Sequence, residues 1–133
     1  HMICNEENLQ VDKDWFKNKI AEEKELIKNQ REIYLQGKKS ISPEGKIAIL
    51  VDDGIATGLT MRVTIKEIKE KHPQKIVVAS PIIPQDTAVF GADEIIGLLE
   101  PPLEEFLGAV GSYYQDFPQV SDEEVVELMK KIY

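Results

Sequence analysis

Two adjacent acids, Asp52 and Asp53, stand between a run of aliphatic residues and a segment rich in glycine and threonine. Carboxylates accept hydrogen bonds from the hydroxyl groups of a ligand. In a regular strand the two side chains would point to opposite faces, but Gly54 permits the chain to turn directly after them. We therefore expect that both acids can bind the same ligand.

The segment from Ala56 to Thr60, with the sequence ATGLT, leads directly into residues with helical spacing. Backbone N–H groups at the start of a helix have no partner inside it, and two threonine hydroxyls lie beside them. Hydrogen bonds of this kind to a phosphate each contribute roughly 1.5 to 3 kcal/mol, so four or five would hold the group without a lysine. A phosphate site beside two carboxylates fits a ribose 5-phosphate, whose 2- and 3-hydroxyls would donate to the acids.

Three short segments are aliphatic and do not alternate with polar residues, which is the pattern of strands buried on both faces of a parallel sheet. These segments are residues 47–51, 75–80 and 94–99. Between the first two, Met61, Ile65 and Ile68 repeat at helical spacing, which predicts a β-α-β unit. Residues 81–93 leave room for one or two helical turns. The acids thus stand at the carboxyl end of a strand, where open α/β sheets bind their ligands.

Helices are also expected toward both ends of the chain. A long amphipathic helix is predicted from Val11 to Gly37, with Asp12 or Asp14 as its N-cap, followed by an exposed loop over residues 38–46.

Near the end of the chain, Ser121 and Glu124 have the spacing of a capping box, which predicts a helix over residues 122–131. The sequence therefore predicts one α/β domain over residues 1–133. Its parallel sheet has flanking helices, and a long helix precedes the sheet.

The composition restricts the possible partners. The 133 residues include 16 basic and 24 acidic side chains, a net charge of -8, which argues against sequence-independent binding to nucleic acid or anionic membranes. Cys4 is the only cysteine, and with His72 the only histidine beyond the first residue, no Cys/His metal cluster is expected. Apolar runs fall far short of the ~20 residues that span a bilayer, and no leader is recognisable. We expect a cytoplasmic protein.

At the acids and the threonine-rich segment, the chain resembles the type I phosphoribosyltransferases. The stretch LVDDGIATGLTMR, residues 50–62, is similar to the family's motif for phosphoribosyl pyrophosphate (PRPP), in the form found in a branch of predicted members. The stretch FLGAVGSYYQDFPQVSDEEV, residues 106–125, is similar to the C-terminal signature of the same branch. The resemblance extends from about Cys4 to the end of the chain.

The resemblance implies a role for each matching residue. Asp52 and Asp53 would be the catalytic residues, because they would bind the ribose hydroxyls and favour positive charge at the anomeric carbon as pyrophosphate leaves. The loop for the 5-phosphate would comprise Gly54, Ala56, Thr57, Gly58, Leu59 and Thr60. The reaction would transfer phosphoribosyl from PRPP to a nitrogen base, with Mg²⁺ bound through the substrate and not directly by the protein.

Further residues have a role by resemblance or by residue type. Lys38, in the stretch YLQGKK, matches a basic position of the branch and could approach the pyrophosphate, as could Arg62. Lysines in such a loop are also typical of a solvated surface. Tyr113, Tyr114 and Phe117 offer rings for stacking on a base. Aromatic residues in a short tail more often form core or subunit contacts.

The chain departs from the family pattern at three places. Nothing before Val11 resembles the family's N-terminal β-α portion, whose loop binds pyrophosphate. Ala56 stands where purine-type relatives carry an acid, and residues 81–94 are several residues shorter than the usual crossover. We therefore expect this chain alone to be weak or inactive as a transferase. We also expect a homo-oligomer, because a sheet of three strands exposes an edge.

Other interpretations compete with this one. The loop could serve a non-catalytic module that senses PRPP or a nucleotide. The Asp-Asp-Gly stretch could be only a turn that ends a strand. A phospho-receiver domain would need another aspartate at the end of a later strand, where Ser80 and Pro81 stand.

Overall fold

The computed structural model describes residues 12–85, 87 and 91–132. The chain divides into two compact units. Among the described residues, the sheet unit contains residues 42–117 and the helical unit contains residues 12–41 and 118–132. A single domain over residues 1–133 stays a prediction.

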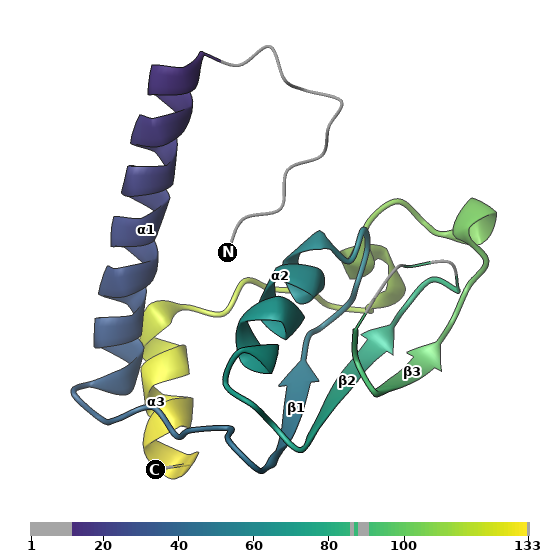
Figure 1. The fold of residues 1–133 in the computed structure, drawn as a ribbon. Helices are drawn as coiled ribbons and strands as arrows, with labels where there is room; N and C mark the ends of the chain where they lie inside the picture. The colour runs from purple at the N-terminus through teal and green to yellow at the C-terminus, as the bar shows by residue number, and fades with distance from the viewer. Residues whose placement is uncertain (1–11, 86, 88–90, 133) are drawn as a thin grey trace. The chain divides into compact units, whose positions relative to one another are not determined.

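Three parallel strands form the centre of the sheet unit, in the spatial order β1-β2-β3 (Figure 1). They are β1 (Ile47–Val51), β2 (Lys75–Ile82) and β3 (Glu94–Leu99). The three predicted strands are confirmed, and β2 is two residues longer than expected. In the register of the sheet, Val51 pairs with Ala79, and Ser80 pairs with Gly97. The strands are parallel, so their carboxyl ends lie at the same edge of the sheet.

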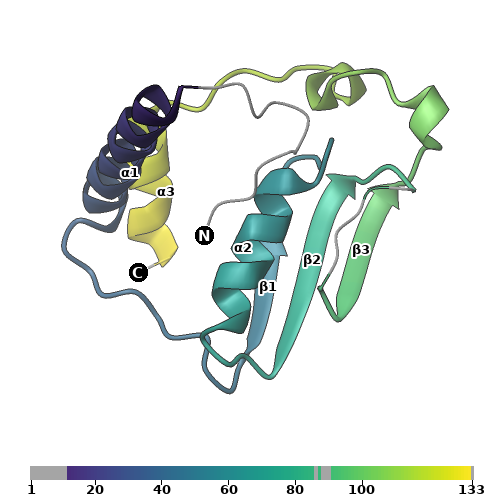
Figure 2. The ribbon, with the colours of Figure 1, turned by 45° about the horizontal axis from the view of Figure 1, so that its top comes forward.

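Helix α2 (Leu59–Lys69) connects β1 to β2 and lies along one face of the sheet (Figure 2). Its buried side chains, Met61 and Ile65, belong to the hydrophobic core. The rest of that core comes from the loop before the helix, from β2 and from the segment after it, through Ile55, Ile76, Val78 and Ile83. The predicted β-α-β unit is confirmed. Burial of these aliphatic side chains, each contributing about 1.5 to 3 kcal/mol, holds the carboxyl end of β1 against the start of α2.

The prediction that all three strands are buried on both faces is wrong for β1 and β3. Only β2 is largely buried, whereas Ile49 in β1 is 62% exposed and Leu98 in β3 is 80% exposed. An aliphatic run is compatible with burial on both faces, but it carries no information about which element covers each face. The exposed residues of β1 lie on the face opposite Leu50, which packs against the core under α2.

Short segments complete the sheet unit. One or two helical turns are predicted within residues 81–93. Strand β2 occupies the first two of these residues, because it continues to Ile82. Residues 86 and 88–90 lie outside the described residues. After β3, the chain forms two short 3₁₀ helices, η2 (Leu103–Glu105) and η3 (Val110–Tyr113).

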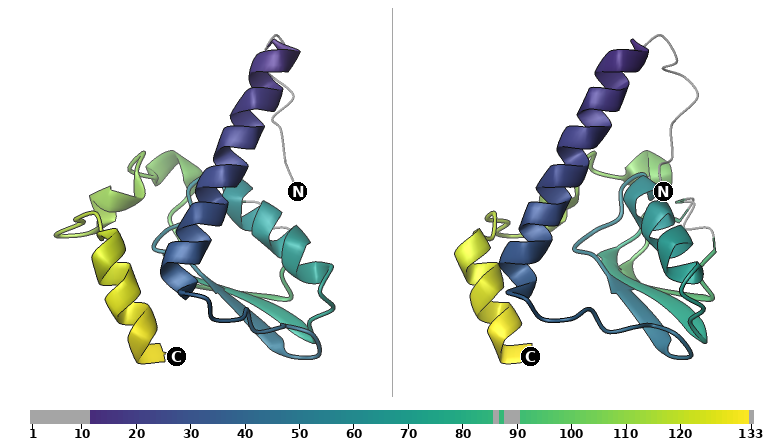
Figure 3. Two further views of the ribbon diagram at one scale, coloured as in Figure 1. Left: turned by 90° about the vertical axis from the view of Figure 1, so that its left-hand side faces the viewer. Right: turned by 60° about the vertical axis from the view of Figure 1, so that its left-hand side comes forward.

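The helical unit contains α1 (Lys13–Leu35) and α3 (Asp122–Ile132), which lie side by side (Figures 1 and 3). The Asp12 carboxylate caps α1 by accepting hydrogen bonds from the N–H groups of Asp14, at 2.7 Å, and Trp15, at 3.1 Å. This confirms one of the two predicted N-caps. Val11, the expected start of the helix, lies outside the described residues.

The start of α3 has the predicted capping box. The Ser121 N–H donates to Glu124 Oε2 at 2.9 Å, and the Glu124 N–H donates to Ser121 Oγ at 3.3 Å. The Tyr34 hydroxyl of α1 donates to Asp122 Oδ1 at 2.6 Å and so links the two helices. In the part of the chain that the structure describes, no helix has the length and apolar character that crossing a membrane requires.

Candidate functional site

The turn after β1 places the two acids. The Asp52 N–H donates to the carbonyl of Ala79 at 3.3 Å, and the Ile55 N–H donates to the carbonyl of Ile82 at 2.9 Å. The segment therefore stays beside β2 after β1 has ended. Between these two anchors, the Asp53 N–H donates to Asp52 Oδ1 at 3.0 Å, which orients the Asp52 carboxylate within the turn.

Helix α2 begins without a side-chain cap. Its N-cap residue, Gly58, has φ 73°, a left-handed conformation that is costly for other residues. Among the described residues, no side-chain hydrogen bond caps this helix start. The N–H of Arg62 donates to the Gly58 carbonyl at 2.9 Å and so closes the first turn. The N–H groups of Leu59, Thr60 and Met61 precede that bond and have no partner within the helix. They form a positively polarised group of donors suited to an anion.

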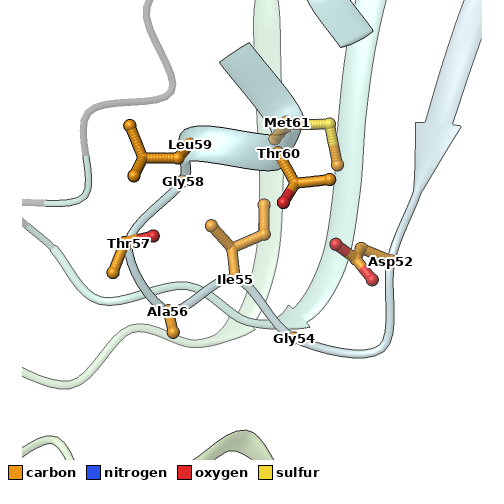
Figure 4. A pocket seen from close by; sticks show the side chains of 9 residues that line it. All are labelled: Asp52, Gly54, Ile55, Ala56, Thr57, Gly58, Leu59, Thr60 and Met61. Carbon is orange, nitrogen blue, oxygen red and sulfur yellow. The ribbon is translucent and has the colours of Figure 1, made fainter. Parts of the chain in front are cut away.

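The turn and the helix start enclose a pocket of about 190 Å³ (Figure 4). Its lining consists of Asp52, Gly54, Ile55, Ala56, Thr57, Gly58, Leu59, Thr60 and Met61. Ile55 and Met61 are 2% and 5% exposed, so they anchor the loop in the core, whereas Thr57 and Thr60 are exposed. In Figure 4 the Asp52 carboxylate points toward the loop, on the side where Thr60 lies. The pocket thus combines one acid with hydroxyl and backbone donors.

The environment of Asp52 raises the pKa of its carboxyl above the ordinary value. Burial of the half-buried side chain is the largest cause, because it disfavours the charged form. The hydrogen bond from the Asp53 N–H opposes this effect by favouring the charged form, and the nearby negative charge of Asp53 adds to the increase. A donor on a ligand would lower the cost of holding this charge in the pocket.

The structure brings together most of the residues that the sequence singles out. Asp52 and all six residues of the expected phosphate loop line one pocket. The Asp53 side chain is exposed and is not part of the lining. Arg62 lies in the first turn of α2 and is not in the lining either. Lys38 belongs to the helical unit and not to the sheet unit that contains the pocket.

The three predicted stacking residues pack against neighbours in the segment after β3. The ring of Tyr113 stacks on Phe106 with centroids 5.7 Å apart, and its hydroxyl accepts a hydrogen bond from the Leu107 N–H at 3.1 Å. The rings of Tyr114 and Phe117 are 4.9 Å apart. None of the three lines the pocket. Their stacking on a base stays a prediction.

Sequence reasoning did not identify several residues that support the pocket. Ile55 and Met61 contribute to its lining, and the Thr87 hydroxyl donates to the Ala56 carbonyl at 3.3 Å. The Tyr114 hydroxyl donates to the Asp53 carbonyl at 2.6 Å. The two apolar residues have the pattern of ordinary core positions. The two hydroxyl donors act from far along the chain, so no local spacing reveals them.

The described residues contain no group of three or more His, Cys, Asp or Glu side chains placed to hold a metal ion. The pocket itself supplies a single carboxylate, that of Asp52. Divalent magnesium keeps several non-protein oxygen ligands and is commonly bound through one or two carboxylates and substrate phosphates. The donor set of this pocket therefore fits a magnesium ion that arrives with a phosphorylated ligand.

Comparison with known proteins extends these observations. The phosphoribosyl transferase domain family matches residues 8–101 of the chain. Two relatives, from the CDC 1551 and H37Rv strains of Mycobacterium tuberculosis, each carry the name "Putative phosphoribosyl transferase" and are 40% identical over 116 residues. The match covers 84% of this chain and 26% of each relative, so the chain spans about a quarter of the length of the relatives.

The fold also resembles a solved structure, that of TT1426 from Thermus thermophilus. The TM-score is 0.75 at 27% sequence identity, and the match covers 91% of this chain and 58% of TT1426. This likeness confirms the predicted α/β class, with a parallel sheet and flanking helices.

Proposed function

Because this chain belongs to the phosphoribosyl transferase domain family, we propose that its pocket binds the ribose 5-phosphate portion of PRPP. One observation carries the proposal: an acid at the end of β1 and an uncapped helix start line the same small pocket. The 5-phosphate would accept hydrogen bonds from the first N–H groups of α2 and from the hydroxyls of Thr57 and Thr60. The Asp52 carboxylate would accept a hydrogen bond from a ribose hydroxyl.

The size of the pocket indicates that it would enclose only part of PRPP. At about 190 Å³, it is smaller than the roughly 300 to 1,000 Å³ of sites that enclose a drug-sized molecule. It suits a phosphate and part of a sugar. The pyrophosphate and the base would lie outside this lining.

In the longer family proteins, we propose that the site serves the transfer of phosphoribosyl to a nitrogen base. The bond between the anomeric carbon and the pyrophosphate oxygen breaks, and pyrophosphate leaves with the electron pair. A nitrogen lone pair of the base then forms the new bond to the same carbon. Asp52 would orient the ribose and favour the positive charge that develops at that carbon.

Magnesium fits this proposal as a companion of the substrate. PRPP carries several negative charges, and the chain has a net charge of -8, so the ion would reduce the repulsion between them. The oxygens of PRPP would hold the ion, because the described residues provide no metal cluster of their own. The role of this chain would be to bind the ribose and the 5-phosphate.

Calorimetric titration with PRPP and magnesium tests the proposal. Each threonine hydroxyl that bonds a phosphate contributes roughly 1.5 kcal/mol or more, so Thr57→Ala or Thr60→Ala should weaken binding about tenfold. The double variant should weaken binding about a hundredfold if the two effects add. Thr64→Ala is the matched control, because the Thr64 hydroxyl already donates to the Thr60 carbonyl at 3.0 Å inside α2. We expect that variant to bind like the wild type.

The outcomes distinguish the competing functions. Binding that the double variant loses, together with release of pyrophosphate when a base is added, supports a transferase. Binding without turnover supports the alternative of a module that senses PRPP or a nucleotide. Failure of the folded wild-type chain to bind PRPP would contradict the proposal.

A further inference from the structure

We propose that Tyr114 is a positioning residue, which fixes the turn that carries Asp52 toward the pocket. For its effect on a ligand, this inference rests on the proposed function, whereas its effect on the turn does not. The Tyr114 hydroxyl donates to the Asp53 carbonyl at 2.6 Å, across 61 positions of sequence. Both residues belong to the sheet unit.

The contact acts on the middle of the turn, between its two backbone anchors. Backbone hydrogen bonds to β2 fix the N–H groups of Asp52 and Ile55, on either side of the turn. The Asp53 carbonyl lies between these anchors in the chain and is held by Tyr114. Rotation of the peptide between Asp53 and Gly54 would change the direction of the chain as it enters the pocket lining. The tyrosine restrains this rotation.

The segment that contains η3 and Tyr114 also packs closely on Gly54, the residue after Asp53. A Cβ atom on Gly54 would lie 2.2 Å from Val110 Cγ1 and 2.6 Å from Val110 Cγ2, which is closer than such atoms can approach. Only glycine allows η3 to lie this near to the turn. The segment with η3 and Tyr114 therefore contacts both Asp53, through the hydrogen bond, and Gly54, through Val110.

The Tyr114 side chain is itself supported. Its ring lies 4.9 Å from the ring of Phe117, measured between centroids. Phe117 in turn packs against Gly111, where an added Cβ would lie 3.0 Å from Phe117 Cδ1. A hydroxyl on a ring that is held in this way loses little conformational entropy when it bonds the turn. The support makes Tyr114 suited to hold a binding group in place.

The test compares Tyr114→Phe with Tyr34→Phe. Tyr34 is the matched control, because its hydroxyl also donates one 2.6 Å hydrogen bond, to Asp122 in the helical unit. The first readout needs no ligand: nuclear magnetic resonance measures the motion and solvent exchange of the Asp53 and Gly54 amides. We expect Tyr114→Phe to increase both and Tyr34→Phe to leave both unchanged.

The second readout is the affinity for PRPP with magnesium. Loss of one neutral hydrogen bond corresponds to about a threefold to tenfold weaker affinity, so we expect this change for Tyr114→Phe alone. If the wild type does not bind PRPP, the proposed function fails, and the amide measurement still decides the role of Tyr114. Unchanged amides in Tyr114→Phe would overturn the inference, whatever the affinity.

A second pair of variants tests the same contact from the other side. Gly54→Ala should displace the turn and increase the motion of the Asp53 amide. Val110→Ala in the same chain removes Cγ1 and Cγ2, the two atoms that lie nearest to the added Cβ. This second substitution should restore most of the original order of the Asp53 amide. Equal behaviour of the single and double variants would contradict the proposed contact. Thermal unfolding of each variant shows whether it is folded under the conditions of the test.

Discussion

The Asp52 side chain is half-buried at the end of β1, and burial is the main reason that its carboxyl has a raised pKa. The folded protein therefore binds a proton at this position more readily than the unfolded chain does. As pH rises through the raised pKa, the folded state must hold a partly desolvated charge, and this group then lowers the free energy of unfolding. This loss of stability occurs at a position where a ligand hydroxyl would donate a hydrogen bond to the charged carboxylate.

Asp52→Asn should separate ligand binding from stability. We expect the variant to lose affinity for PRPP and to be at least as stable as the wild type at neutral pH. The difference in melting temperature, variant minus wild type, should grow as pH rises above about 4, because the wild-type carboxyl then ionises. Thermal unfolding at a series of pH values measures this difference. Asp53→Asn, at an exposed side chain, is the control, and a pH trend of the same size in that variant would contradict the explanation.

At the scale of elements, the start of α2 is the feature on which the site depends. Gly58 adopts φ 73° as the N-cap, and this conformation turns the loop into a helix whose first residues, Leu59, Thr60 and Met61, line the pocket. A left-handed conformation costs a residue with a side chain roughly 1 to 2 kcal/mol. The glycine is therefore required by the geometry of the helix start.

Gly58→Ala should reduce both stability and affinity. We expect the free energy of unfolding to fall by about 1 kcal/mol and binding of PRPP to weaken, because relief of strain moves the first turn of α2. Gly45→Ala is the matched control. Gly45 has φ 65°, and no atom lies within 4 Å of an added Cβ, so that variant should lose similar stability while it binds normally. Chemical denaturation and calorimetry measure the two quantities. Equal loss of affinity in both variants would contradict a specific role of the helix start.

The elements with local signals could be predicted from the sequence. The Asp12 cap and the Ser121–Glu124 capping box involve residues within three positions of each other, and both are confirmed. The pocket lining was largely predictable for the same reason, because it comes from one short segment. The bond between Tyr114 and Asp53 spans 61 positions and depends on packing, which no local pattern records. The exposed faces of β1 and β3 could not be predicted either, since aliphatic runs do not specify what covers them.

At the scale of the whole molecule, exposed apolar residues on the sheet support the expectation of a homo-oligomer. Val51 in β1 is 75% exposed, and Leu98 in β3 is similarly accessible. The terminal strands β1 and β3 each have a partner on one side only in the three-stranded sheet of the described residues. Exposed apolar side chains and open strand edges both favour association.

Light scattering over a range of concentrations tests the expectation. The apparent mass should exceed that of one 15.1 kDa chain as concentration rises. Leu98→Lys should reduce the association, because it places a charge on the exposed face. A strictly monomeric species at high concentration would contradict the expectation. Ser112→Lys, in η3 and away from the strands, controls for the added charge.

The proposed function requires that the pocket holds a ribose 5-phosphate group. A crystal structure of the chain with ribose 5-phosphate would show whether it does. We predict the phosphate at the start of α2, within hydrogen-bond distance of the N–H groups of Leu59 and Thr60, and a ribose hydroxyl at the Asp52 carboxylate. A ligand bound elsewhere, or an empty pocket at saturating ligand, would contradict the claim.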